Sequence, residues 1–480
     1  MTETVKPKLE FRGGWGMSLV PVAIFLFFCI LYFVIFQAFE MYALAMGSFV
    51  ALLIGSLLVQ KGQYERFWDA VYDGARESIP ILVLLLIIGM FSALVKATGL
   101  STGFVWLAQQ AGVSGGIFTA FTFFAVCVVA AATGSSLGTM FISFPIFYAA
   151  GLQLGCDPAM LAGAIVGGGI FGDNVAPISD TTIISASTQE YTKKDGFADI
   201  GGCVKSRSRY ALCAAAISFV LYWIFGGGAV MGTGGEEILA ASASPTSLWM
   251  LIPVVVMLTV AIITRNIYKA IIAGLLLGSV VGLATGLITF ENIIGVKDGA
   301  PVGFLTDGVN GMIATAILVL SVYGIMGELN AAGALEKFTS GILNSKLGNS
   351  VQGAEACMLG GITVTTMLFG GVTSASMATF GKIQNEVGKR VGLHPYRRAN
   401  LLDCGANSLA LVVPFLSVFA LIGSMLSGGY DVAQLSIVAV AGCTFYCMAL
   451  FVMLVISIIT GWGRRFEGEN GEPVKEPPTK

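Results

Sequence analysis

The chain has 480 residues, of which 56% are hydrophobic and 11% are charged, and its formal net charge is -2. The slightly acidic balance excludes a surface for nucleic acid. A single histidine and the lack of a Cys-x-x-Cys pair exclude a histidine- or cysteine-based metal centre, and we expect no cofactor. The apolar runs recur near the roughly 20 residues that a helix needs to cross a bilayer, which predicts an all-α polytopic membrane protein.

The first half of the chain contains a series of predicted crossings. Apolar runs lie at 17–37, about 79–98, about 115–134, about 139–154 and about 210–228, and a further segment at 167–187 is interrupted by glycines and a proline. Basic residues near span ends stay on the cytoplasmic side, so the Lys and Arg pattern orients these runs. With a second crossing between Glu40 and Lys61, the half has an odd number of crossings. The next half therefore begins outside.

Three groups of basic residues are predicted to lie in cytoplasmic loops. They are Lys193, Lys194, Lys205, Arg207 and Arg209; Lys389, Arg390, Arg397 and Arg398; and Arg464 and Arg465. We expect His394, beside the second group, to be solvated. Glu328 and Glu355 lie near predicted span ends, where an interfacial position is expected. Both polar tails are expected to be mobile.

The second half repeats features of the first in the same order. The matches are Asp73-Gly74 with Asp307-Gly308, Gly99 with Gly333, TGSSLGT at 133–139 with TSASMAT at 373–379, and Pro158 and Pro177 with Pro395 and Pro414. Because the second half starts on the opposite side, these matches predict two inverted-topology repeats. The predicted division is a cytoplasmic tail at 1–14, repeat one at 15–230, an extracytoplasmic linker at 231–246, repeat two at 247–464 and a cytoplasmic tail at 465–480. Some helices are expected to be broken or re-entrant, giving about 12 to 14 transmembrane segments.

The segment GGGIFGDNVAPISDTTIISAS, residues 167–187, carries two aspartates inside an apolar run. A carboxylate deep in a bilayer costs several kcal/mol unless it is paired, faces water or holds a cation. The glycines and Pro177 predict that the helix opens and frees carbonyl oxygens. An all-oxygen shell suited to Na+ is then predicted from Asp173, Asn174, Ser179, Thr181 and Thr182. The alternative for Asp180, or for Ser179, is to cap the half-helix that follows.

The counterpart in the second half is NLLDCGANSLALVVPFLSVFALIG, residues 400–423. Asp403, Asn407 and Ser408 are predicted to complete the ion site from this side. The alternative for Asp403 is an ion pair with Arg397 or Arg398.

Hydroxyl-rich stretches precede both broken segments at matched positions. We predict that they form tips that line the substrate path, at Thr133, Ser135, Ser136, Thr139, Thr373, Ser374, Ser376 and Thr379. Packing between helices through small residues is the alternative.

The motif GDNVAPISDTT, residues 172–182, resembles the signature of the NhaC-type Na+/H+ antiporters in the ion-transporter superfamily, and the similarity extends over essentially the whole chain. Many members have serine where this chain has Ala176. The resemblance implies an ion site that includes Asp173, Asn174, Ser179, Asp180 and Thr181, with Na+ held at Asp173, Asn174, Asp180 and Thr181. It also implies a homodimer with a mobile transport domain and a static scaffold, in a bacterial cytoplasmic membrane with both termini inside.

These observations predict a secondary transporter, not an enzyme. Na+ and H+ would compete for Asp173, together with Asp180 or Asp403, during alternating access. The alternative on the same fold is a Na+-coupled carrier or exchanger of a small amino acid or carboxylate. A channel would not use matched broken helices. An intramembrane aspartyl protease would also need two aspartates, but it has no use for the hydroxyl shell or the inverted repeat.

Overall fold

The computed structural model describes residues 8–36, 41–100, 102, 103, 106, 115–228, 244–264, 266–297, 299–334, 350–428, 430 and 432–477. Within these residues the chain is helical apart from two antiparallel two-stranded hairpins. The hairpins are β1 (Gly295–Lys297) with β2 (Ala300–Val302), and β3 (Phe466–Glu467) with β4 (Pro473–Val474). Of the predicted linker, residues 231–243 lie outside the described part.

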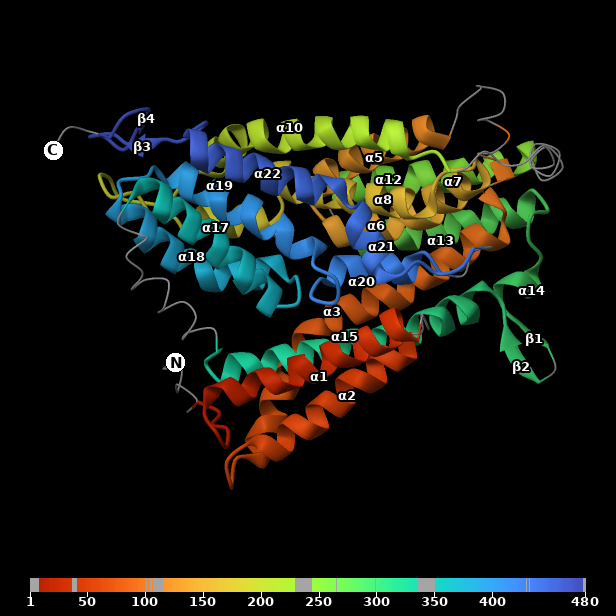
Figure 1. The fold of residues 1–480 in the computed structure, drawn as a ribbon. Helices are drawn as coiled ribbons and strands as arrows, with labels where there is room; N and C mark the ends of the chain where they lie inside the picture. The colour runs from red at the N-terminus through yellow and green to blue at the C-terminus, as the bar shows by residue number, and fades with distance from the viewer. Residues whose placement is uncertain are drawn as a thin grey trace.

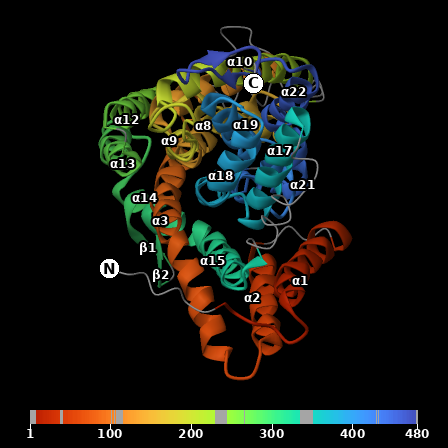
Figure 2. The same ribbon diagram turned by 90° about the vertical axis from the view of Figure 1, so that its left-hand side faces the viewer.

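One group of helices forms a unit that we call the scaffold, seen in the lower part of Figures 1 and 2. It contains α1 (Val20–Cys29), α2 (Met41–Leu58), α3 (Tyr64–Ala97) and α15 (Phe304–Ala331). Higher in both views, α13 (Ile267–Ala284) packs against α3, and α12 (Leu251–Thr264) packs against α13. The short helix α14 (Phe290–Ile293) and the β1–β2 hairpin lead from α13 into α15.

The remaining helices form a second unit in the upper part of Figure 1, which we call the transport unit after the domain that the resemblance leads us to expect. Its first half contains α5 (Gly115–Thr133), α6 (Ser136–Ser143), a π-helical turn (Phe144–Tyr148), α7 (Ala149–Gln153), α8 (Pro158–Val175), α9 (Asp180–Ser187) and α10 (Ile200–Phe225). Its second half contains α17 (Val351–Leu368), α18 (Thr373–Arg390), α19 (Pro395–Ala406), a 3-10 turn (Leu409–Val412), α20 (Val418–Leu426), α21 (Ile437–Cys443) and α22 (Phe445–Thr460).

Glycines set the close crossing of α3 and α15 in the scaffold. A Cβ atom on Gly74 would lie 2.3 Å from the carbonyl oxygen of Tyr323, and one on Gly308 would lie 2.4 Å from the backbone nitrogen of Met90. Only glycine allows the two backbones to approach so closely. Gly74 and Gly308, which match between the two halves, therefore each allow a close backbone contact, one at either end of the same crossing.

Both predicted broken segments are interrupted helices. α8 begins at Pro158 behind Asp157, whose carboxylate accepts from the backbone nitrogen of Met160 at 2.8 Å, and α19 begins at Pro395 behind a matching cap. Proline suits the first helical position because its missing N–H would have no partner there. The first interruption spans 176–179, and the second spans 407–417 with the 3-10 turn inside it. The helix openings predicted in the segments that contain Pro177 and Pro414 are therefore confirmed.

The apolar helices agree with a multi-pass membrane protein. Among the described residues, six helices are long and apolar enough to cross a membrane, or seven if α21 and α22, bent by 51°, count as one span. Shorter apolar helices lie at Tyr42–Leu58, Pro245–Ala261 and Tyr268–Ala284. The prediction of an all-α polytopic fold is confirmed, while the count of about 12 to 14 segments stays a prediction.

Several charged residues are buried, contrary to the sequence prediction. α10 begins at Ile200 instead of near residue 210, and this extension carries Arg207 into the interior. Arg397 and Arg398 lie on the buried α19, and His394 caps its start. The prediction that His394 is solvated was wrong. The three arginines, predicted to lie on the cytoplasmic side, are buried with polar partners inside the protein.

Glu328 and Glu355 are also fully buried, so the interfacial position predicted for them was wrong. Glu355 accepts from Nε of Arg397 at 2.7 Å and from Nη2 of Arg464 at 2.5 Å, which compensates its charge inside the transport unit. Glu328 lies on α15 in the scaffold. Within the described residues, neither of its carboxyl oxygens has a hydrogen-bond partner.

The described parts of both tails are folded onto the protein, which corrects the prediction that they are mobile. Leu9 donates its backbone N–H to the carbonyl of Ala331 at 2.9 Å, and its side chain is buried. At the other end, Glu467 is buried and its Oε1 accepts from the backbone nitrogens of Thr192 and Lys193, each at 2.7 Å. Local polar sequence did not reveal these tertiary contacts.

Candidate ion site at the broken helix

The backbone at the end of α8 frees one carbonyl oxygen. In a continuous helix, the carbonyl of Asp173 would accept from the N–H of residue 177, but Pro177 has none. Two hydroxyls at the start of α9 take its place: Thr181 Oγ1 donates to this carbonyl at 3.2 Å and Thr182 Oγ1 at 3.0 Å. The proline and the two threonines thus turn the end of α8 into a cluster of oxygen atoms.

The side chain of Asp173 belongs to the same cluster. It is 3% exposed, and its Oδ1 accepts from Ser179 Oγ at 3.1 Å. Ser179 Oγ lies 2.9 Å from Thr181 Oγ1, and Ser136, at the start of α6, lines the same cleft as Asp173. Ser179 occupies the cap position of α9, yet its side chain does not cap the helix. A hydroxyl can rotate and offer a lone pair, so these donors can become cation ligands.

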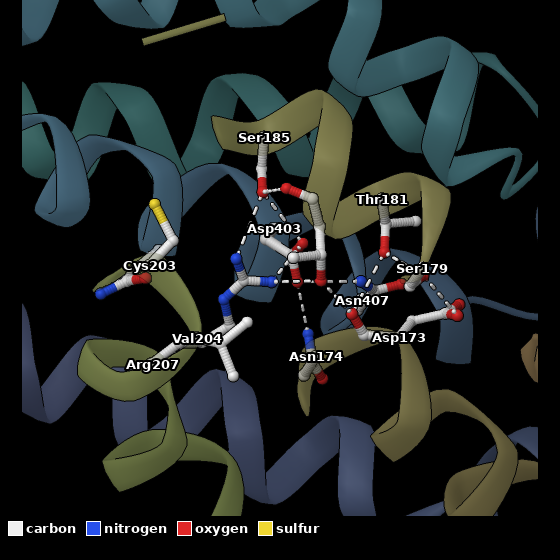
Figure 3. Close-up of polar contacts among 12 residues, drawn as sticks. Asp173, Asn174, Ser179, Thr181, Ser185, Cys203, Val204, Arg207, Asp403 and Asn407 are labelled. Carbon is white, nitrogen blue, oxygen red and sulfur yellow. Dashed lines mark hydrogen bonds and ion pairs between the residues drawn. The ribbon is translucent and has the colours of Figure 1, made fainter. Parts of the chain in front are cut away.

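Asn174 connects the two broken segments. Its Nδ2 donates to Oδ1 of Asp403 at 2.8 Å, and its Oδ1 accepts from the hydroxyl of Tyr446 at 2.7 Å. Asp403 lies on α19 in the other half of the chain, and Figure 3 shows the two side chains pointing toward one another. The structure therefore brings the predicted residues of both halves into one buried network.

Asp403 is paired with a residue that the sequence analysis did not consider. Its Oδ2 forms an ion pair with Nη1 of Arg207 on α10, and both side chains are fully buried. Ser185 Oγ also donates to Oδ2, at 3.2 Å. The alternative of a pair with Arg397 or Arg398 was wrong, because those arginines point to Glu355 and to Asn385.

Asn407 and Ser408 differ in what they offer the site. Asn407 Nδ2 lies 3.4 Å from Oδ1 of Asp403, and its buried Oδ1 has no hydrogen-bond partner among the described residues. Figure 3 draws Asn407 in the same network as Asp403, to which its amide points. Ser408 instead donates to the carbonyl of Gly405 within its own segment, at 2.8 Å.

A cleft of about 540 Å³ opens between the transport unit and the scaffold at this site. Its walls include Thr133, Ser135, Ser136, Thr373 and Ser374 from the two tips, Asp173 and Asp180 from the break, and Glu77 and Tyr323 from the scaffold. Asp180 contacts the second tip directly, because its Oδ2 accepts from Ser374 Oγ. The cleft thus joins the cluster of oxygen atoms to a space far larger than a bare ion.

Three of the predicted tip residues do not line this cleft. Thr139 bonds Thr133 at 3.0 Å, Ser376 bonds Thr366 at 2.8 Å, and Thr379 donates to the carbonyl of Ala375 one turn earlier at 2.9 Å. The buried Thr139 and Ser376 thus join α6 to α5 and α18 to α17, which fits packing between helices, the alternative for this set. Thr379 is exposed, and its hydroxyl bonds only its own helix.

The sequence analysis missed Arg207, Ser185, Tyr446 and the scaffold wall of the cleft. A signal for Arg207 was present, because it lies on the helical stripe formed by Cys203, Tyr210, Ala211 and Ala214, all of which are buried. Lys205 and Arg209 fall off this stripe. The partner of Asn174 and the residues opposite the tips carry no local pattern that would mark them.

The site combines carboxylate oxygens with neutral hydroxyl, amide and carbonyl oxygens, and it is not a cluster of several acidic side chains. Among the described residues, no group of three or more His, Cys, Asp and Glu side chains is arranged to hold a metal ion. A cation at the break would instead rest on Asp173 with hydroxyl, amide and carbonyl oxygens, which are suitable ligands for a hard ion.

Known proteins with similar sequences include several antiporters. Residues 13–227 match the Na+/H+ antiporter family. A malate-2H+/Na+-lactate antiporter of Bacillus subtilis is 25% identical over 316 residues, or 62% of this chain and 65% of that protein. The arginine/ornithine antiporter ArcD of Halobacterium salinarum is 25% identical over 385 residues, or 75% of this chain and 74% of that protein. The Na+/H+ antiporter NhaC of Alkalihalophilus pseudofirmus is 32% identical over 138 residues, or 28% of this chain and 29% of that protein.

These matches agree with the motif at residues 172–182, which lies inside the matched region. They also agree with the apolar helices and with broken segments that meet at one buried site. Over residues 13–227 the chain is therefore similar to the Na+/H+ antiporter family, and NhaC is among the proteins it resembles.

Proposed function

We propose that the protein exchanges Na+ for H+ by alternating access, with Asp173 as the carboxylate that binds either ion. The observation that carries this proposal is the oxygen cluster at the break: a buried carboxylate, hydroxyls that can turn, and a carbonyl without its helical donor. The proposed Na+ ligands are drawn from Asp173, Asn174, Ser179, Asp180, Thr181, Thr182 and Asn407.

Competition at one carboxylate couples the two ions. A buried carboxylate needs a compensating positive charge, and either Na+ or a proton supplies it. An empty, ionised site is costly to move through the bilayer interior, whereas the loaded forms cross. Na+ moving in one direction then returns a proton in the other, and no separate proton relay is needed.

The arrangement of the two units supports a moving transport unit against a fixed scaffold. The cleft lies between them, with the tips and the break on one wall and α3 and α15 on the other. We propose that both termini are cytoplasmic, that the protein lies in a bacterial cytoplasmic membrane, and that it forms a homodimer through the scaffold.

The test uses purified protein in liposomes with a trapped pH dye and an imposed Na+ gradient. Wild-type protein is expected to move protons against the direction of Na+, and Asp173→Asn is expected to abolish this movement. Asp157→Asn is the matched control. Asp157 caps the start of the same helix through Met160, and asparagine also caps well. Proton movement retained in Asp173→Asn would refute the proposal.

A second candidate function is the Na+-coupled transport or exchange of a small amino acid or carboxylate. The specific observation in its favour is the cleft of about 540 Å³, which is in the range of ligand pockets and far exceeds the space a bare ion needs. Two of the relatives are named for organic solutes, a malate/lactate antiporter and an arginine/ornithine antiporter.

Labelled malate, lactate, arginine and ornithine distinguish this second candidate. Na+-dependent uptake into the same liposomes, with a raised KM in Ser374→Ala but not in Thr379→Ala, would favour it. Ser374 lines the cleft, whereas Thr379 lies on the same helix away from it. If none of the four solutes is taken up, ion exchange alone remains.

A further inference from the structure

The donors around Asp403 leave no room for a transported cation. Its Oδ1 faces the amides of Asn174 and Asn407 at 2.8 Å and 3.4 Å. Its Oδ2 faces the Arg207 guanidinium and the hydroxyl of Ser185. A carboxylate offers roughly four lone-pair positions, so these four donors occupy its capacity.

Arg207 is built into the site from several sides. Besides Asp403, its Nη1 lies 3.2 Å from Thr182 Oγ1, and its Nη2 lies 3.3 Å from Ser185 Oγ. Figure 3 shows the guanidinium entering the network from α10, between α9 and α19. An arginine stays protonated under all ordinary conditions, so this positive charge is permanent.

Asp173 has the opposite character. Its carboxyl accepts from the hydroxyl of Ser179, and no arginine or lysine pairs with it among the described residues. Hydroxyls can give up their donor role to a cation, whereas a guanidinium and amide N–H groups cannot. The two buried aspartates are therefore chemically distinct, one neutralised by the protein and the other available.

We propose that Arg207 is the resident counter-ion of Asp403, so that Asp403 positions Asn174 and Asn407 instead of binding the transported ion. This inference rests on the proposed function, because it assigns exchange at the site to Asp173. It also sets the charge moved: one Na+ replaces one proton on one carboxylate, and the exchange is electroneutral. Arg207 is thus a positioning residue that determines how many charges the site can carry.

A double-mutant cycle that removes the charge of Asp403, of Arg207 or of both tests the ion pair in the liposome assay. Asp403→Asn leaves a buried guanidinium beside the Na+ ligands and is expected to raise the KM for Na+ by about tenfold or more. Arg207→Gln leaves a second buried carboxylate and is expected to make exchange respond to an imposed membrane potential, which the wild type does not. The double variant Arg207→Gln with Asp403→Asn removes both charges and is expected to return the KM to within about threefold of wild type.

Rescue by the double variant is the decisive outcome. A double variant that is folded, as judged by gel filtration and thermal unfolding, but has the same raised KM as Asp403→Asn would overturn the proposal, because Asp403 would then act on the ion directly. Potential-dependent exchange in the wild type would also overturn it. Arg207→Lys keeps the charge and is expected to stay potential-independent, so a potential-dependent, folded lysine variant would exclude a counter-ion role.

The counter-ion role of Arg207 can be tested even if the protein does not exchange Na+ for H+. If the wild type moves no protons but takes up a labelled solute with Na+, the same cycle is measured on the KM for Na+ in solute uptake. Rescue there would support the counter-ion role while Na+/H+ exchange itself is rejected.

Discussion

The side-chain amide of Asn174, in the last turn of α8, donates to Oδ1 of Asp403 on α19 at 2.8 Å. This hydrogen bond joins a residue from each half of the chain at the point where both helices break. Both side chains are buried, and Arg207 and Tyr446 close the network on either side. The break after α8 is therefore anchored to the counterpart segment, and the proposed motion would carry both together.

The first prediction concerns the carbonyl of Asp173. Thr181→Val removes one of the two hydroxyl donors that replace the missing N–H of Pro177, and it removes a proposed ligand. A buried acceptor that loses a partner costs about 1–3 kcal/mol. We expect the KM for Na+ to rise roughly tenfold. Thr379→Val, whose hydroxyl serves only its own helix, is the control, and an unchanged KM in Thr181→Val would count against the hydroxyl ligand.

The second prediction concerns the scaffold crossing. Gly74→Ala places a Cβ atom 2.3 Å from a backbone oxygen, and Gly308→Ala places one 2.4 Å from a backbone nitrogen. Such overpacking costs about 1–3 kcal/mol, so both variants are expected to unfold at lower temperature. Gly311→Ala on the same helix meets nothing within 4 Å and is expected to unfold like the wild type. Equal melting temperatures for all three would refute this close crossing.

The third prediction concerns the buried acid Glu355. Glu355→Gln leaves the buried Arg397 without its carboxylate partner and weakens the contact with Arg464. Breaking a buried ion pair from one side costs about 3–5 kcal/mol. We expect a large drop in thermal stability, whereas Glu386→Gln, at an exposed position on α18, should have little effect. A stable Glu355→Gln protein would show that this pair is dispensable.

The fourth prediction concerns His394, which lies outside the predicted membrane spans and contacts the C-terminal hairpin. Burial lowers the pKa of His394 from 6.5 to about 4, although the bond to the carbonyl of Gly471 opposes this shift. His394 therefore binds a proton more readily when the hairpin is undocked than when it is docked. Docking is strongest above the ordinary pKa and weakens as the pH falls toward the lowered value.

Hydrogen exchange of residues 465–474 measures this docking. Protection of the hairpin is expected to decrease as the pH falls through that window, after correction for the intrinsic exchange rate. His394→Gln cannot be protonated and is expected to show no such decrease. A wild-type hairpin whose protection does not change would contradict the buried, neutral state of His394.

The sequence predicted most of what depends on local pattern. The lengths of the apolar runs predicted the helical membrane fold, and glycines with Pro177 predicted the break and the oxygens around Asp173. The matched Asp-Gly pairs predicted a repeat, and the structure places their glycines at the two ends of one helix crossing. The sequence did not reveal which charges pair in three dimensions, because the partners of Arg207 and Glu355 lie far away in the chain. The polar composition of the two tails also gave no sign that they dock onto the rest of the protein.

The most direct test of the central claim is whether Na+ binding expels a proton from Asp173. Purified protein in weakly buffered detergent is titrated with Na+ while a dye reports proton release and labelled Na+ reports binding. The wild type and Asp157→Asn are expected to release a proton for each Na+ bound, and Asp173→Asn is expected to release none. Na+ binding by the wild type without proton release would contradict competition at this carboxylate.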